Sequence, residues 1–288
     1  MRKELLFSDV KALPVIRDND SAGKSWAKHA CDIVESGYSL VSISRRAKES
    51  FERFLDEYRR LSKEDKEKFS FPESTEGFLP IGLSYSGEPD ATDLCEMFCY
   101  WSKYRGLRDH EYPQIRSLHE AVKVYEEELS GYASVLLDEI SKIYGASEKF
   151  DVRNDSYIQL NAYRGELRRV GREYLQNLHE DGHLLTLLKP NAPGLLLLVN
   201  GQEHLADVMS DQIVVMAGSL LSALTGGKVR PMYHSVLNLT HPAMRISVGY
   251  NVNDMSEARR SFTEDRMVPV GKISNENHMG FGNYRYKD

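Results

Sequence analysis

The feature of this 288-residue chain that most constrains its fold is a change in the spacing of apolar residues near residue 156. From there on, apolar residues recur at a period of two in short runs that prolines and glycines separate. Six runs carry the pattern: SYIQLNAY (156–163), HLLTLL (183–188), GLLLLV (194–199), DQIVVM (211–216), YHSVLNL (233–239) and MRISVGYNV (244–252). Short strands at such close spacing predict a β-sandwich or barrel of the jelly-roll kind.

The first half of the chain has a mainly helical pattern instead. Apolar residues recur at steps of three and four between Ser117 and Tyr144, and Gly145 follows, which predicts one long central helix. Two earlier segments have the same helical period: 21–38, which stops at Gly37, and 45–69. Two further segments, LPVI (13–16) and CEMFCYW (95–101), are expected as strands.

No repeat or low-complexity linker separates the two halves, so we expect a single unit, mainly β with flanking helices. Its parts would be a mainly helical N-terminal region (1–150), a jelly-roll core of the double-stranded β-helix type (151–270) and a polar C-terminal tail or flap (271–288).

Charge and composition limit the classes of partner and the compartment that are expected. The net charge of −6 gives no general attraction for phosphate backbones, so nucleic acid is not expected as a partner. The longest apolar run, LLLLV, is far too short to cross a membrane, and the N-terminus has no apolar signal-peptide core. Three cysteines in a chain of this size are typical of a reducing compartment, and we expect a cytoplasmic protein.

The stretch HEDGH (179–183) allows two incompatible interpretations. On a helix it would place His179 and His183 one turn apart as zinc ligands, with Glu180 as the general base and Glu203 as a third ligand, as in a zinc peptidase. Glycine within the motif disfavours a helix by about 1 kcal/mol. The run LLTLLKPNAP that follows offers no polar helical face and contains two prolines, so the zinc interpretation is the less favoured.

On a strand, the same stretch places His179 and Asp181 on one face, as two thirds of a two-histidine, one-carboxylate iron site. Such a site needs a distant second histidine, and His234 lies in the strand-like run YHSVLNL. Arg245 and Ser247 would then point the same way from a later strand, which suits the end of a dicarboxylate.

This combination of H-x-D, a later histidine and R-x-S resembles the iron(II)- and 2-oxoglutarate-dependent dioxygenases, and most closely their isopenicillin-N-synthase-like branch. LNAY (160–163) resembles the N-x-Y motif of that branch, and HEDGHLLTLL resembles its H-x-D-x-x-x-L-T-L-L segment. Weaker likenesses extend over nearly the whole chain: LPVI, ESGYSLV, LSKEDKEKF, EGFLPIG and DLCEMF. The chain departs from the branch at His183, at Ala217-Gly218-Ser219 and at Ser42-Ile43-Ser44, none of which is an expected ligand.

The resemblance implies a role for each residue of these motifs. His179, Asp181 and His234 would bind iron(II), Arg245 and Ser247 would hold the far carboxylate of 2-oxoglutarate, and Asn161 and Tyr163 would support that co-substrate. The reaction would consume O₂, and ascorbate is expected to help in vitro. Since Asp181 is present, hydroxylation, desaturation or ring closure of a small specialised metabolite or amino-acid derivative is expected, not halogenation.

Four residues are candidates for substrate contact: Arg168, Phe98, Phe281 and His183. A solvated loop is the simpler alternative for Arg168, and a partly buried structural histidine for His183. Two other functions stay open, namely a 2-oxoglutarate-independent oxidase of the isopenicillin-N-synthase type and a non-catalytic jelly-roll binding module. The sequence leaves the substrate and the oligomeric state undetermined.

Overall fold

Two β-sheets that pack face to face form the centre of the molecule. The structure is a computed structural model, and it describes residues 13–71, 76–86, 92–104, 115–164, 172–239 and 244–280. The larger sheet has the strand order β2 (Tyr38–Ser42), β11 (Gln212–Ala217), β8 (Leu185–Pro190), β13 (Arg245–Val252), β6 (Tyr157–Tyr163), β5 (Glu96–Trp101), β4 (Glu76–Leu79) and β3 (Ser70–Phe71). The smaller sheet has the order β1 (Val15–Ile16), β10 (Gln202–Ala206), β9 (Leu195–Val199), β12 (His234–Leu237) and β7 (Tyr174–His179). Among these neighbours only β1 and β10 are parallel.

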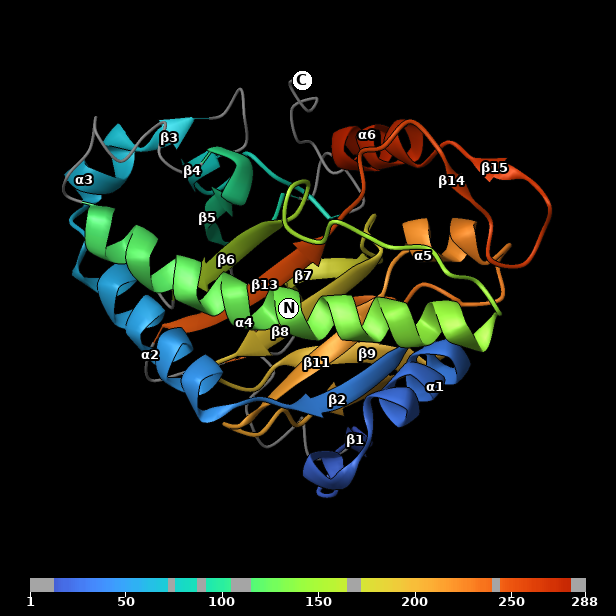
Figure 1. The fold of residues 1–288 in the computed structure, drawn as a ribbon. Helices are drawn as coiled ribbons and strands as arrows, with labels where there is room; N and C mark the ends of the chain where they lie inside the picture. The colour runs from blue at the N-terminus through green and yellow to red at the C-terminus, as the bar shows by residue number, and fades with distance from the viewer. Residues whose placement is uncertain are drawn as a thin grey trace.

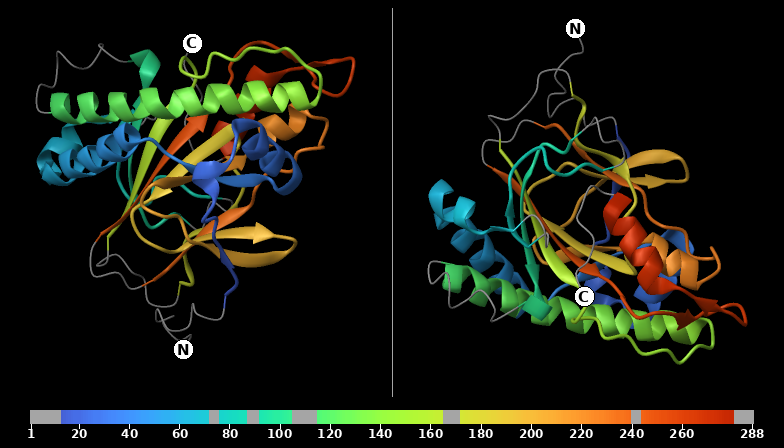
Figure 2. Two further views of the ribbon diagram at one scale, coloured as in Figure 1. Left: turned by 60° about the horizontal axis from the view of Figure 1, so that its bottom comes forward. Right: turned by 90° about the horizontal axis from the view of Figure 1, so that it is seen from above.

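Apolar side chains from both sheets meet between them, for example Leu188 and Val214 of the larger sheet with Leu195 of the smaller. The outer face of the larger sheet is covered by α1 (Trp26–Ser36), α2 (Arg45–Arg60) and α4 (Arg116–Ile143), of which α4 packs on the other two (Figures 1 and 2). The apolar stripe of α4, with Leu129 and Leu136, is fully buried, and each such leucine contributes about 1.5–3 kcal/mol.

Serines start the N-terminal helices. Ser25, Ser44 and Ser62 each accept a hydrogen bond from the backbone N–H three residues on, which satisfies an N–H that the helix itself leaves unpaired. Because Ser62 starts a new helix, α3 (Lys63–Lys68), the predicted helical segment 45–69 is divided in two. Gly37 ends α1 as predicted, in the left-handed conformation with φ 82°.

Strands β6 and β13 lie side by side in the middle of the larger sheet, and both alternate strictly. Their apolar residues, such as Leu160 and Val248, face the helices. The opposite face carries polar residues and points toward the smaller sheet: Tyr157, Gln159, Asn161 and Tyr163 of β6, with Arg245, Ser247 and Asn251 of β13. The interior between the sheets is therefore partly polar.

The fold agrees with the predicted class, mainly β with flanking helices, but several elements were not predicted. Strands β2, β3, β4 and β10 and helix α5 (Ser219–Leu224) were missed, and β7 was expected only through the strand interpretation of HEDGH. Residues 271–280, expected as part of a polar tail or flap, belong to α6 (Val270–Gly280), which lies beside α5 (Figure 1). Two short strands, β14 (Arg259–Arg260) and β15 (Met267–Val268), precede it. In the part of the chain that the structure describes, no helix combines the length and apolar character needed to span a bilayer.

Candidate metal centre

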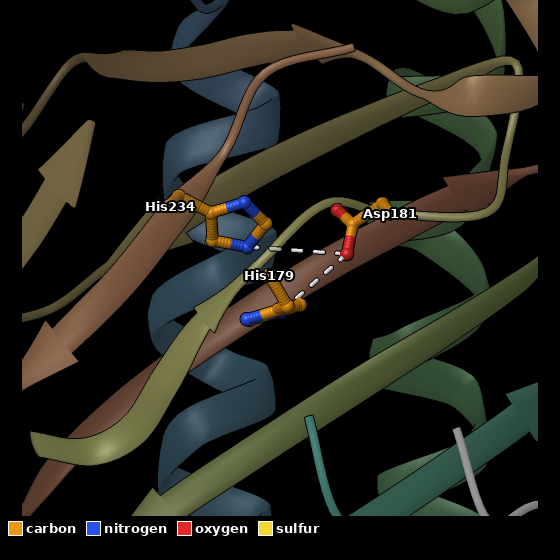
Figure 3. A group of neighbouring side chains, drawn as sticks. All are labelled: His179, Asp181 and His234. Carbon is orange, nitrogen blue, oxygen red and sulfur yellow. Dashed lines mark ion pairs between the residues drawn. The ribbon is translucent and has the colours of Figure 1, made fainter. Parts of the chain in front are cut away.

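Three potential metal ligands meet where β7 and β12 run together. His179 is the last residue of β7, His234 is the first of β12, and the two stand opposite each other in this antiparallel pair. Asp181 lies in the turn after β7, and its Oδ1 is 3.7 Å from Nε2 of His179 and 3.9 Å from Nε2 of His234 (Figure 3). Ligand atoms from all three residues lie within 4.8 Å of one another, close enough to share one ion.

The hydrogen bonds of the two imidazoles fix which nitrogen faces the centre. Nδ1 of His179 donates to the carbonyl of Asn177 at 2.7 Å, and Nδ1 of His234 donates to that of Met232 at 3.4 Å. Since a carbonyl can only accept, the protons sit on Nδ1 and the Nε2 lone pairs are free to bind metal. Burial, followed by the nearby His234, lowers the pKa of His179 to about 4, so the ring is neutral as a ligand must be.

The carboxylate of Asp181 is held in its charged form. Burial on its own would raise the pKa of this group, but the neighbouring histidines outweigh burial, and the pKa lies below its ordinary value. One anionic carboxylate and two neutral imidazoles on one side of a site are a donor set that suits iron(II) and leaves other positions open.

Helices α5 and α6 fix the loop that carries Asp181. The N–H of Ser219, at the start of α5, donates to the carbonyl of Asp181 at 2.9 Å, and Asn277 of α6 donates to the carbonyl of Gly182 at 3.0 Å. Two glycines allow this contact: a Cβ on Gly218 would lie 2.2 Å from the carbonyl oxygen of His183, and one on Gly182 would lie 2.4 Å from Asn277. The glycine in HEDGH and the one in Ala217-Gly218-Ser219 therefore both permit close packing around the candidate ligand.

The helical interpretation of HEDGH is wrong. Residues 180–184 form an irregular turn between β7 and β8, so His179 and His183 do not share a helix face, and only the first of them belongs to the ligand cluster. Glu203, the third ligand in that interpretation, instead accepts hydrogen bonds from Tyr174 and Ser235. The strand interpretation also needs a correction, because β7 ends at His179 and Asp181 reaches the site from the turn.

Arg245 presents a charged group with unmet hydrogen-bonding capacity. It is 1 % exposed, its Nε donates to the carbonyl of Pro193 at 3.0 Å, and both terminal nitrogens, Nη1 and Nη2, are buried without a partner among the described residues. Its Cζ lies 4.9 Å from the ring centre of Tyr163, the residue opposite it on β6. Ser247, also buried, lies two positions along β13, opposite Asn161.

A buried guanidinium with two unpaired nitrogens is costly unless a ligand fills them. A carboxylate is the group that matches this pair of parallel N–H donors. The residues around Arg245 therefore fit the carboxylate end of an oxoacid such as 2-oxoglutarate.

A pocket opens beside the metal ligands, and its polar lining was largely missed by the sequence analysis. The described lining residues are Ser84, Tyr85, Ser86, Asp93, Met97, Tyr157, Gln159, Gln176, His179, Asp181, His183 and Asn251. A signal for part of this lining was present in YIQLNAY, where every second residue is polar or a tyrosine. No comparable pattern marks Ser86 or Asp93, because loop residues have no fixed period.

The candidates for substrate contact have different outcomes. His183 lines the pocket, where its Nε2 lies 3.3 Å from the hydroxyl of Tyr157. Phe98 does not: it is fully buried on the helix side of β5 against Phe54 and Phe78, and its neighbour Met97 faces the pocket, as strand alternation requires. Arg168 and Phe281 lie outside the described residues.

Comparison with solved structures shows which fold this is. A Caulobacter crescentus protein of the 2OG-Fe(II) oxygenase family superposes with a TM-score of 0.72 at 17 % identity, over 95 % of this chain and 97 % of that one. The rice dioxygenase for auxin oxidation gives 0.71 at 16 % identity, over 96 % and 97 %. A full-length Neurospora crassa protein in complex with α-ketoglutarate (2-oxoglutarate) gives 0.70 at 16 % identity, over 95 % and 94 %. No family model and no curated protein sequence matches the chain. The chain thus has the fold of the 2OG-Fe(II) oxygenases, and the jelly-roll prediction is confirmed.

Proposed function

We propose that this protein is an iron(II)- and 2-oxoglutarate-dependent dioxygenase that oxidises a small molecule. The observation that carries the proposal is the joint presence of a His–Asp–His cluster, in which both histidines are buried, and, on the facing sheet, a buried arginine with two unpaired nitrogens. The fold of the 2OG-Fe(II) oxygenases supports it.

In this proposal, one set of side chains binds the metal and another set binds the co-substrate. His179, Asp181 and His234 hold iron(II), while Arg245 and Ser247 bind the far carboxylate of 2-oxoglutarate from β13. Asn161 and Tyr163 support the co-substrate from β6, the adjacent strand. Bound together, iron and 2-oxoglutarate would supply the oxidising power, with O₂ as the oxidant. The protein orients these groups and keeps them away from bulk water.

We propose a specialised metabolite or an amino-acid derivative as substrate, and hydroxylation, desaturation or ring closure as the reaction. Neighbouring structures support a small organic substrate, since the Neurospora protein was crystallised with thymine and with 5-formyluracil. Retention of Asp181 favours these reactions over halogenation, which would need the carboxylate's position for a halide. The finer resemblance to the isopenicillin-N-synthase-like branch stays a prediction.

A 2-oxoglutarate-independent oxidase is the second candidate, because the same two unpaired nitrogens of Arg245 could hold the carboxylate of a substrate. Succinate release separates the two. The first candidate predicts one succinate for each 2-oxoglutarate consumed, and the second predicts O₂ uptake without succinate.

An anaerobic titration tests the metal and co-substrate together. Adding iron(II) and then 2-oxoglutarate to the purified protein should produce the visible absorption band of the iron–oxoacid complex, and Asp181→Ala should abolish it. Asp211→Asn, an exposed change, is the control. A full-strength band in Asp181→Ala would contradict the proposal. A metabolite screen for 2-oxoglutarate-dependent succinate release, with Asp181→Ala as the blank, then searches for the substrate.

We also propose a cytoplasmic location, supported by Cys31, Cys95 and Cys99, none of which forms a disulfide in the structure. Cell fractionation with an antibody against the chain tests this.

A further inference from the structure

A second carboxylate faces the candidate metal pocket without being one of its ligands. Asp93 is 3 % exposed and lines the same pocket as His179 and Asp181. It lies in the loop just before β5, which begins at Glu96. Its backbone N–H donates to the carbonyl of Ser84 at 3.0 Å, which ties it to another residue of the lining. The ligand cluster of His179, Asp181 and His234 does not include it.

Within the described part of the chain, both hydrogen bonds to this carboxylate come from Ser86. The backbone N–H of Ser86 reaches Oδ1 at 3.2 Å, and its hydroxyl reaches Oδ2 at 2.9 Å. A carboxylate oxygen can accept about two hydrogen bonds, so each oxygen retains capacity for one more. Arg172 is the nearby cation: its Nη1 donates to the carbonyl of Thr92 at 2.6 Å, and its buried Nη2 makes no hydrogen bond to Asp93.

A directed chain of hydrogen bonds makes Asp93 an acceptor. The hydroxyl of Tyr163 donates to Oε1 of Gln176 at 2.9 Å, and Nε2 of Gln176 donates to the hydroxyl of Ser86 at 2.9 Å. The Ser86 hydroxyl, having accepted from Gln176, directs its own proton to Asp93. This series of hydrogen bonds runs from Tyr163, beside Arg245, to the pocket. It leaves Asp93 able to accept a hydrogen bond from a ligand in the pocket.

Burying a carboxylate is costly without a strong partner. Burial raises the pKa of Asp93, although Ser86, His179 and Arg172 oppose the rise. A bound group that donates N–H hydrogen bonds would offset that cost, whereas a bound anion would increase it.

The other residues that line the pocket also favour a group that donates N–H hydrogen bonds. The other polar members of the lining apart from the metal ligands and His183 are neutral hydroxyls and amides, namely those of Ser84, Ser86, Gln159, Gln176 and Asn251 with two tyrosines. Among the described lining residues, no lysine or arginine side chain could pair with an anionic substrate group. A nitrogen-bearing group could donate a hydrogen bond to Asp93, and carbonyl or hydroxyl groups beside it could hydrogen-bond with the side-chain amides.

We propose that Asp93 determines substrate specificity by accepting hydrogen bonds from a nitrogen-bearing group, either an ammonium or a ring N–H. The proposal rests on the proposed function, since it concerns the substrate of that same site. It narrows the substrate from any small molecule to one that carries an N–H donor.

Paired probes test this by binding instead of turnover. Affinities for the protein loaded anaerobically with iron(II) and 2-oxoglutarate would be measured by calorimetry or ligand-observed NMR. One arm compares thymine with 1,3-dimethylthymine, in which both ring N–H groups are blocked, and the other compares benzylamine with benzyl alcohol. In at least one arm, the N–H-bearing member should bind at least tenfold more tightly to the wild type, and the arm that responds identifies the kind of nitrogen.

Asp93→Asn should bring the responding pair to within about threefold of parity, because the amide keeps the shape but loses the charge and one acceptor. Asp265→Asn, at an exposed aspartate, is the control and should keep the preference. No preference in either wild-type pair, or a preference that persists in Asp93→Asn, would overturn the proposal. The iron–oxoacid absorption band is recorded in every sample. Its absence from the wild type would refute the proposed function, and its loss in Asp93→Asn alone would show that Asp93 supports the cofactor site and does not select substrate.

Discussion

At the scale of single residues, the two unpaired terminal nitrogens of Arg245 give the most direct test of co-substrate binding. A ligand that binds only the folded state stabilises it, by about 2.7 kcal/mol at one hundred times its dissociation constant. We expect 2-oxoglutarate with iron(II) to raise the unfolding free energy of the wild type in this way. Arg245→Met should lose nearly all of that gain, as measured by anaerobic urea unfolding with and without the co-substrate.

Arg53→Met serves as the control, since Arg53 is exposed on α2. An equal gain in Arg245→Met and wild type would show that the carboxylate binds elsewhere. Arg245→Lys should fall between the two, because an ammonium keeps the charge but cannot form the two parallel hydrogen bonds.

Gly218 tests whether the ligand loop depends on close backbone packing. The Cβ of Gly218→Ala would lie 2.2 Å from the carbonyl oxygen of His183 and 2.5 Å from that of Asp181, so the loop must move. We expect the variant to lose about 1–3 kcal/mol of stability, the usual cost of overpacking, and to bind iron(II) more weakly. Chemical unfolding and metal titration measure the two effects.

The matched control is Gly131→Ala, at an exposed position of α4 with no atom within 4 Å of the added Cβ. That change should stabilise the protein by up to about 1 kcal/mol, because alanine favours a helix more than glycine does. Similar behaviour of the two variants would contradict the packing argument.

At the scale of elements, α6 is expected to control metal affinity. Its Asn277 donates to the carbonyl of Gly182 at 3.0 Å and to the hydroxyl of Ser219 at 3.1 Å, so it joins α5, α6 and the ligand loop. Asn277→Ala should weaken iron(II) binding about tenfold, the lower end of the effect of removing groups that orient metal ligands. Met279→Ala, on an exposed side chain of the same helix, should bind as the wild type does in an anaerobic metal titration. Unchanged affinity in Asn277→Ala would show that α6 does not orient the loop.

The elements also show where the sequence was sufficient and where it was not. Periodicity predicted α4 and the central strands β6 and β13, because their burial on one side is uniform along the element. It missed α6, whose sequence VGKISNENHMG has no clear apolar face. Tertiary contacts stabilise this helix: Ser274 donates to Asn253 and to the carbonyl of Asp254, and Val270 is buried.

The candidate site also contains residues that the sequence predicted and residues that it missed. The clustering of His179, Asp181 and His234 agrees with the prediction from motif spacing, and strand alternation predicted that Arg245 and Ser247 share one face of β13. The sequence analysis missed Asp93 and Gln176, since their place in the pocket lining depends on which loop and strand lie across the pocket. Phe98 was assigned to the wrong face of β5, an error of one residue that reverses the side of the sheet.

At the scale of the whole molecule, the candidate site exists only when the two sheets have packed together. Both histidines lie on the smaller sheet, whereas Arg245 and Ser247 lie on the larger one. If the proposed function holds, binding of iron and 2-oxoglutarate together would be coupled to the packing of the two sheets. For this reason, the stability of the ligand-free core and its dependence on pH bear directly on function.

Lys189 gives that stability a defined pH dependence. It is 3 % exposed on β8, and its Nζ donates to the carbonyls of Ser210 at 2.8 Å and Gln212 at 2.9 Å. Burial lowers its pKa to about 8, below the value of about 10.4 for an unfolded lysine. Between these values the unfolded chain binds more protons than the folded one, so this group makes stability rise with pH.

The variant Lys189→Met lacks the titrating group, while all other ionisable residues are shared with the wild type. The unfolding free energy of the wild type minus that of Lys189→Met should therefore increase by about 2–3 kcal/mol between pH 7 and pH 10. Urea unfolding of the ligand-free proteins at several pH values measures this difference. A flat difference would mean that the hydrogen bonds to the 209–212 turn keep the pKa of the ammonium near its ordinary value, and that Lys189 holds the end of β11 as a permanent cation.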